Sequence, residues 1–241
     1  MPEAARVTDK TSHPGVLAPS GHPTVTYDGL PSTTLGDKHI CTLHPPCNPI
    51  TTGSPTVEIG GLPAARRGDL CDCGAIIVPP CSPTVEIGGV AAPYPLLASQ
   101  NCYGWASGAS AFRQPGDTSG MGWSSDPATL AGEMNAATVQ KRLTDDLGAP
   151  MSNPDAAAPP GMHKAMFFTT PDYDAAHPNW DFHVYRQDSD GLWSHKPGGT
   201  PIRRFDSSCK SITDPRTATR LLNGGPTSYT QYIGTWLVPN H

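Results

Sequence analysis

The chain of 241 residues lacks the features that mark several large classes of protein. It has no apolar run long enough for a membrane-spanning helix, and no hydrophobic N-terminal segment of the kind that directs classical export. Only 15% of its residues are charged and the net charge is −5, so no basic surface indicates nucleic acid. We therefore expect a protein made in the cytoplasm without a signal peptide, with no membrane span and no nucleic-acid partner.

Proline and glycine are abundant instead, with 28 and 25 residues. In the first half of the chain this enrichment favours short strands and many turns over long helices. Three copies of a short pattern lie there, each closing on a near copy of Gly-Ser-Pro-Thr-Val. Each copy places an aspartate at the same register position: Asp9, Asp37 and Asp69. A short repeat cannot bury its apolar face alone, so we expect the copies to pack together as an all-β domain.

The repeat pattern ends near Pro95, which predicts a chain of two parts. A length of 241 residues accommodates one or two domains, and the repeat boundary favours two. We expect a repeat domain over residues 1–92, a proline-containing linker over 93–99 and a second domain over 100–241.

The repeat part mixes five of the seven cysteines with histidines. In a reducing cytosol this mixture indicates metal binding before disulfide formation. The residues two places after the repeat aspartates are Thr11, His39 and Cys71, and those four places after them are His13, Cys41 and Cys73. Because equivalent loops converge near the repeat axis, we expect some of these side chains to meet around a metal ion.

Four residues of this region suit a structural zinc ion. His13, His39, His44 and Cys73 would give the ion a closed tetrahedral shell with no open position. The binding energy would then stabilise a domain whose core is small. The competitors for places in this set are Cys41, Cys47 and Cys71. Cys209, in the second half, is interpreted as incidental.

The repeat part resembles the PAAR domain family over residues 1 to about 92. The resemblance rests on Ala4-Ala5-Arg6-Val7, Gly36-Asp37-Lys38-His39, Pro63-Ala64-Ala65-Arg66 and Cys73-Gly74-Ala75-Ile76-Ile77-Val78. It implies a β-rich cone of threefold pseudosymmetry that caps the VgrG spike trimer of a type VI secretion system, with zinc near its tip. It also implies that His13, His39, His44 and Cys73 hold the zinc. The additional cysteines Cys41, Cys47, Cys71 and Cys81 leave room for an alternative ligand.

A cysteine stands near the start of the second part. Cys102 follows Gln100 and Asn101, and a helix that begins near Asn101 places Cys102 in its first turn. There the helix dipole and the unpaired N–H groups are expected to lower the pKa of the thiol and to favour the thiolate. Gln100 and Asn101 are candidate donors to an oxyanion.

Two histidines are candidates to work with this thiol. Residues 181–187 alternate as a strand that carries His183, and residues 192–195 return after a turn as its partner. This hairpin brings His195 near His183, where it would orient the ring. A thiolate, a base and an orienting group are the parts of a covalent acyl-transfer site. The competitors for the orienting role are Asp188, Asp190, Asp206 and Asp214.

The remaining elements make the second part α+β. Asp126 followed by Pro127 begins a helix that Gly148 ends, and residues 164–168 and 229–238 are predicted strands. The order of elements is therefore a cysteine-bearing helix, further helix, and an antiparallel sheet that carries the histidines.

This order resembles the papain-like superfamily, especially the NlpC and CHAP types of amidase and endopeptidase. The resemblance implies that Cys102 is the nucleophile, His183 the general base and acid, and His195 the orienting group. The sequence departs from the family after His183, where Val184 and Tyr185 replace the usual small residues.

The two resemblances together predict a type VI effector that carries a hydrolase on the spike tip. We expect a Cys-His amide hydrolase toxin acting on peptidoglycan peptides. One alternative is a protease or deamidase of a cytosolic target protein, and another is a non-catalytic structural or cargo-adaptor extension of the tip. The predicted partners are the VgrG trimer and a cognate immunity protein. Secretion would deliver the chain to the periplasm or cytoplasm of a target cell.

Overall fold

The computed structural model describes residues 1–18, 22–44, 46–88, 92–93, 99–174, 179–221 and 228–240. The chain forms two compact units. The first, here the repeat unit, comprises Met1–Ala98, Asp188–Ser194 and Thr200–Asp214. The second unit comprises Ser99–Gln187, His195–Gly199 and Pro215–His241. Two segments from the second half of the sequence thus belong to the repeat unit. Most of the linker expected over residues 93–99 lies outside the described residues.

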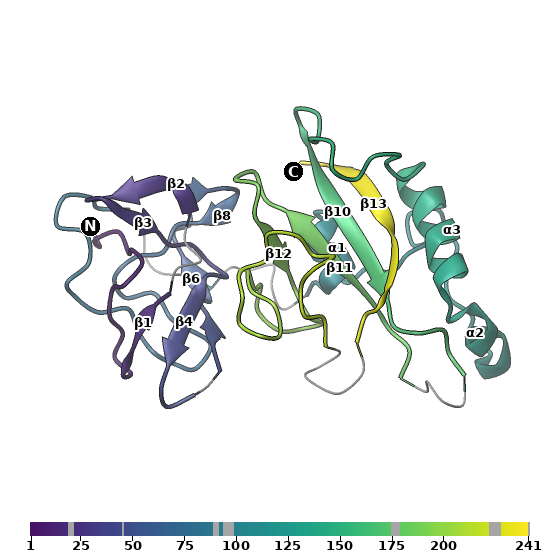
Figure 1. Ribbon diagram of the computed structural model, residues 1–241, viewed down its shortest axis with the longest axis horizontal. Helices are drawn as coiled ribbons and strands as arrows, with labels where there is room; N and C mark the ends of the chain where they lie inside the picture. Colours follow the sequence, from purple (N-terminus) through teal and green to yellow (C-terminus); the bar gives the residue numbers. More distant parts are fainter. Residues whose placement is uncertain are drawn as a thin grey trace. The chain divides into compact units, whose positions relative to one another are not determined.

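The repeat unit is built from short antiparallel strands, as its proline and glycine content predicts (Figure 1). β1 (Gly15–Leu17), β4 (Lys38–Cys41) and β5 (Asn48–Pro49) form a three-stranded sheet. The two-stranded pairs are β2 (His22–Tyr27) with β3 (Leu30–Ser32), β6 (Thr52–Gly53) with β9 (Ala92–Pro93), and β7 (Glu58–Ile59) with β8 (Leu62–Pro63).

Isolated bridges join the three copies of the repeat in a ring. Ala4 pairs with Arg66, Arg6 with Ser32, and Thr34 with Ala64, so each copy contacts both others. The core that this arrangement encloses is small, and consists mainly of alanine, cysteine and single aliphatic residues: Ala5, Leu17, Ile50, Ala65, Cys71, Ala75, Ile77 and Cys81. A core of this size leaves a role for a further source of stability, such as a metal ion or a disulfide.

The repeat aspartates occupy equivalent places in this ring. Asp9, Asp37 and Asp69 each accept a hydrogen bond from the backbone N–H three residues earlier, at 2.7, 2.8 and 2.7 Å. The register inferred from the sequence therefore corresponds to one local structure formed three times.

The second unit contains three helices and strands of an antiparallel sheet. The helices are α1 (Cys102–Ala106), α2 (Pro127–Glu133) and α3 (Ala136–Leu147). The strands β11 (Phe182–Gln187), β10 (Met162–Thr169) and β13 (Gln231–Pro239) lie side by side in that order (Figure 1). β12 (Trp193–His195) is next to β11 in the sheet, and its last residue belongs to this unit. The α+β class is confirmed, and the described helices include none that is long and apolar enough to cross a membrane.

Side-chain caps set the helix boundaries. Asp126 accepts a hydrogen bond from the Thr129 N–H with Pro127 in the first turn, as the sequence predicts. The single helix expected from Asp126 to Gly148 is wrong. It divides because Asn135 adopts an extended backbone conformation and caps α3 by accepting a hydrogen bond from the Thr138 N–H.

A hydrophobic core lies where the helices pack on the sheet. Helix α1 contacts β11 and helix α3 contacts β13. The buried residues at this junction are Cys102, Tyr103, Ala106, Val139, Leu143, Ala165, Phe167, Phe182, Val184, Trp236 and Val238. Cys102 is therefore part of the packed core of the second unit.

Candidate functional sites

Four side chains from the three repeat copies converge in the repeat unit. The donor atoms of His13, Cys41, His44 and Cys73 all lie within 4.8 Å of one another. Cys41 Sγ is 3.8 Å from His13 Nδ1 and 3.5 Å from His44 Nδ1, and Cys73 Sγ is 3.7 Å from His13 Nδ1. Two imidazoles and two thiols at these separations form a group that can hold a metal ion, and a tetrahedral zinc site uses these ligand types.

His39, which the predicted quartet included, lies beside this group of four donors. Its ring is fully buried, and Nε2 lies 2.9 Å from Thr11 Oγ1. Nδ1 lies 3.6 Å from Cys73 Sγ, so His39 contacts one donor of the group from its edge. Burial lowers the pKa of His39, and the neighbouring His13 and His44 lower it further. Cys41 occupies the fourth place in the group, as the competing cysteines of the sequence allowed.

Of the other cysteines of the repeat unit, Cys71 and Cys81 are buried in the small core. Burial raises the pKa of both thiols, that of Cys81 to about 12. These two thiols are protonated at neutral pH and act as small apolar residues. Cys47 forms a disulfide with Cys209, so the interpretation of Cys209 as incidental is wrong.

In the second unit, Cys102 is the first residue of helix α1, as predicted, and Asn101 caps the helix. The effect expected on the thiol is reversed. Burial, followed by the carboxylate of Asp181, raises the pKa of Cys102 to about 12, although three backbone N–H groups act in the opposite direction. The helix terminus is too weak to offset full burial among apolar side chains, so the thiol is protonated.

The two amide side chains before Cys102 are already engaged. The Gln100 Nε2 group donates to the Ala109 carbonyl. The Asn101 Nδ2 group donates to the Arg113 carbonyl at 2.7 Å, while its Oδ1 accepts from the Gly104 N–H at 2.9 Å. Both side chains stabilise the loop and helix start in this arrangement, and neither is aimed at Cys102 as an oxyanion donor.

The two predicted histidines meet as expected from the hairpin. His183 Nε2 lies 2.8 Å from His195 Nδ1, and both rings are buried. His183 also stacks on Tyr229, whose hydroxyl donates to Asp181 at 2.7 Å. Burial and the neighbouring His195 hold the pKa of His183 well below its ordinary value, so His183 is neutral. A neutral imidazole with an ordered partner has the protonation state of a general base.

Cys102 contacts the strand that carries His183. Cys102 packs with Phe182 and Val184, and its Sγ meets the Phe182 carbonyl at 4.0 Å. His183 lies between these two residues in β11, so its side chain projects from the opposite face of the strand. The structure therefore brings His183 and His195 together and places Cys102 against the same strand.

The four aspartates that competed with His195 belong to the repeat unit. Asp188 accepts from Ser194 Oγ at 3.0 Å, and Asp190 accepts from Arg204 at 2.7 Å. Asp206 accepts from the backbone N–H groups of Ser208 and Lys210. Each of these three carboxylates is occupied by partners of its own unit.

Sequence reasoning missed Arg204, whose side chain is fully buried among Asp37, Asp188 and Asp190. A signal was available in the repeat register. Arg6 and Arg66 stand three residues before the first and third repeat aspartates, whereas Thr34 stands before the second. The absence of an arginine from one copy of a repeat pointed to a partner elsewhere in the chain.

Two comparisons with known proteins give matches. The family described as PAAR motif matches residues 7–79, so the repeat unit carries a PAAR motif. The chain is also 33% identical over 145 residues to insoluble matrix shell protein 1 of Ruditapes philippinarum, and this match covers 59% of the chain and 81% of that protein. The chain belongs to the same family as this shell protein. A continuous match of that extent includes helix α1 and Cys102 wherever it begins.

Proposed function

We propose that the chain is the tip protein of a type VI secretion spike. In this proposal the repeat unit caps the VgrG trimer and a zinc ion stabilises its tip. The single observation that carries the proposal is the convergence of His13, Cys41, His44 and Cys73 within a PAAR motif. Each copy of the repeat contributes at least one donor, so a bound ion would fasten the three copies to one another. A threefold arrangement also suits a trimeric partner, because one cap can match the symmetry of the trimer.

Copurification tests this proposal. The full chain is mixed with a VgrG trimer from the same genome, and the stoichiometry of the complex is measured by light scattering. We expect one chain per trimer. Free trimer and free chain at micromolar concentrations would contradict the proposal, provided that the chain carries its metal ion.

We further propose that the second unit is a cysteine hydrolase of amide bonds in peptidoglycan peptides. The position of Cys102 at the start of α1 and the contact of His183 with His195 support this proposal. In the resting arrangement the thiol is protonated, so the reaction requires an approach of Cys102 to His183 that transfers the thiol proton to the ring. His183 would then return this proton to the leaving amine, and His195 would hold the ring.

Two alternative functions of the second unit make different predictions about its substrate and about the residues that it uses. A protease or deamidase of a cytosolic protein would use the same residues on another substrate. A non-catalytic extension would use none of them, and the name of the shell protein, which describes a component of an insoluble matrix, favours such a structural role.

Expression of the full chain in two compartments separates the three possibilities. Wild type and Cys102→Ala are directed to the cytoplasm or the periplasm of a test bacterium, with Cys81→Ala as a matched buried-cysteine control. Peptidoglycan hydrolysis predicts killing only from the periplasm, lost in Cys102→Ala and retained in Cys81→Ala. Killing only from the cytoplasm would support the protein target. Equal growth of all variants would contradict both hydrolase proposals.

A further inference from the structure

We propose that Thr200–Asp214, a segment of the repeat unit from the second half of the sequence, form a redox-latched strap that completes the second repeat copy. The proposal rests on contacts within the repeat unit and is independent of the secretion and hydrolase functions proposed above.

A comparison of the three repeat aspartates shows which contact the strap supplies to the second copy. Asp9 pairs with Arg6 at 3.1 Å, and Asp69 pairs with Arg66 at 3.3 Å. In the second copy the equivalent position holds Thr34, which cannot supply a charge to Asp37. Arg204 of the strap supplies it instead, with its guanidinium 3.6 Å from the Asp37 carboxylate. The strap thus replaces, from a distant part of the sequence, an arginine that the other two copies provide themselves.

Arg204 contacts Asp37 as part of a buried ionic group. The side chain is fully buried and also lies 3.4 Å from Asp188 and 2.7 Å from Asp190. Burial alone lowers the pKa of this guanidinium, but the three carboxylates outweigh that effect and the pKa is raised. Removing one member of a buried ionic group leaves the remaining charges without compensation, so the strap and these aspartates depend on each other.

The backbone of the second copy is also adapted to the strap. The Arg204 N–H donates to the Gly36 carbonyl at 3.0 Å, and a Cβ atom added at Gly36 would lie 3.2 Å from Ile202 Cγ2. The equivalent glycine of the third copy, Gly68, has nothing within 4 Å of such an atom. The two glycines share a positive φ, of 85° and 90°, so the difference lies in the strap that covers only one of them.

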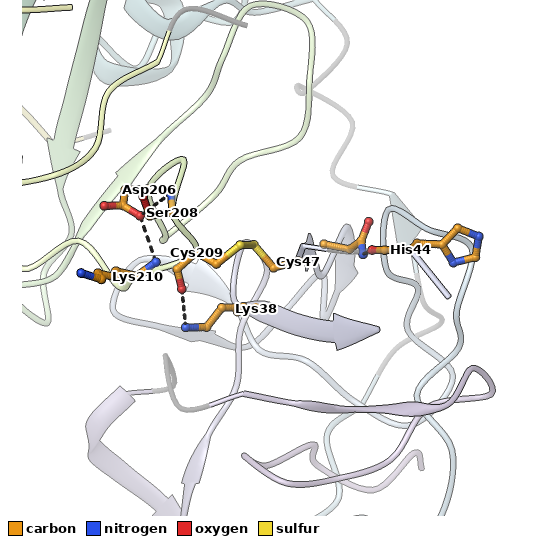
Figure 2. Close-up of a disulfide and its surroundings, with 8 residues drawn as sticks. Lys38, His44, Cys47, Asp206, Ser208, Cys209 and Lys210 are labelled. Carbon is orange, nitrogen blue, oxygen red and sulfur yellow. Dashed lines mark hydrogen bonds between the residues drawn. A yellow bond between two sulfur atoms is a disulfide. The ribbon is translucent and has the colours of Figure 1, made fainter. Parts of the chain in front are cut away.

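A covalent bond closes the strap on the same copy (Figure 2). Cys209 forms a disulfide with Cys47, 162 positions away in the sequence, and its carbonyl accepts from Lys38 Nζ at 2.9 Å. Asp206 holds the turn that presents Cys209, because its carboxylate accepts from the N–H groups of Ser208 and Lys210, each at 2.9 Å. The cysteine is therefore positioned by non-covalent contacts that remain when the disulfide opens.

The latch closes by two thiol–disulfide exchanges with a low-molecular-weight disulfide such as oxidised glutathione. The thiolate of one cysteine attacks the oxidant and releases one thiol, and the other cysteine then displaces the second. The two cysteines lose two electrons and two protons, which the two departing thiols carry. In a reducing medium the reverse exchange opens the bond and leaves the contacts of Arg204 and Lys38 to hold the strap.

A cut in the connecting segment tests the covalent connection. A protease recognition sequence is inserted between Leu96 and Leu97 of the full chain, and the protein is oxidised with glutathione disulfide before cleavage. A denaturing gel without reductant is expected to show one species at the uncut mass, and reductant should release two fragments. Cys209→Ser should give two fragments under both conditions, whereas Cys102→Ser should behave as wild type. Two fragments from the oxidised wild type without reductant would overturn the latch.

Amide hydrogen exchange in the reduced full chain tests the non-covalent part. Arg204→Met is expected to speed exchange over residues 204–212 about tenfold or more, while the neighbouring Arg203→Met leaves it unchanged. In the Arg204→Met background, Thr34→Arg should raise the melting temperature of the repeat unit without restoring protection of the strap. Equal exchange in the two arginine variants would overturn the role of Arg204. The gel experiment is read after denaturation, so its result stands even if Arg204→Met fails to fold.

Discussion

The two units use the same residue types, cysteine and histidine, in opposite surroundings. In the repeat unit His13, Cys41, His44 and Cys73 turn their donor atoms toward one another, and His44 is exposed to solvent. In the second unit Cys102 is packed in an apolar core and His183 is buried beside His195. The first arrangement can hold an ion, whereas the second keeps both groups uncharged. Cys41 is itself buried, so the groups that a side chain faces, together with its burial, decide which chemistry it has at rest.

Metal removal gives the largest expected difference between the units. The binding energy of a structural zinc ion is on the order of 10 kcal/mol, which is comparable to the whole stability of a small domain. We expect a strong chelator to abolish the unfolding transition of the repeat unit in calorimetry and to leave that of the second unit unchanged. A thermogram that chelation does not alter would contradict a stabilising metal in the repeat unit.

The alkylation rate of Cys102 measures how strongly burial suppresses the reactivity of this thiol in the second unit. With a pKa of about 12, the thiolate fraction at pH 8 is about 10⁻⁴, against roughly a quarter for an unfolded cysteine. Iodoacetamide should therefore modify Cys102 about a thousandfold more slowly in the native chain than in denaturant. Mass spectrometry of the modified peptide gives both rates. Similar rates in the native and denatured chain would contradict the raised pKa of Cys102. They would instead support the thiolate that is expected from the helix terminus alone.

Acid is expected to weaken the second unit by a smaller amount. The pKa of His183 is lower in the folded chain than in the unfolded chain. Its contribution to stability is therefore fully present above the unfolded value of about 6.5, and is lost as the pH falls through that value toward the folded one. We expect the unfolding temperature of the second unit to fall between pH 7 and pH 5.

The variant His183→Gln supplies the control for this pH dependence. Glutamine does not titrate, so the variant should be less stable at pH 7 but should show a flatter profile below it. If the unfolding temperature of wild type and variant depended on pH in the same way, groups other than His183 would cause the acid sensitivity.

The sequence predicted features that depend on neighbouring residues. The repeat register placed Asp9, Asp37 and Asp69 in equivalent hydrogen bonds, and the alternation of residues 181–187 brought His183 to His195. The caps Asn101 and Asp126 were also predictable, because a cap acts on the N–H groups within its own turn.

Features that depend on distant packing could not be predicted in the same way. Nothing near Thr200–Asp214 indicates that Arg204 would reach Asp37, because the pairing joins residues far apart in the sequence. His39 and Cys41 lie two residues apart in β4 and share one face of the strand, so its alternation does not distinguish them. That Cys41 rather than His39 joins His13, His44 and Cys73 depends on how loops from the three copies pack together. The raised pKa of Cys102 reflects the core around it, which local sequence does not specify.

Metal content tests the central claim most directly, through two substitutions in the same strand. Zinc per chain is measured by mass spectrometry of the elements in wild type, Cys41→Ser and His39→Gln after purification and dialysis. The structure predicts about one ion per chain in wild type and His39→Gln, and loss of the ion in Cys41→Ser. A wild-type chain without metal, or an ion that survives Cys41→Ser and is lost in His39→Gln, would contradict the site described here.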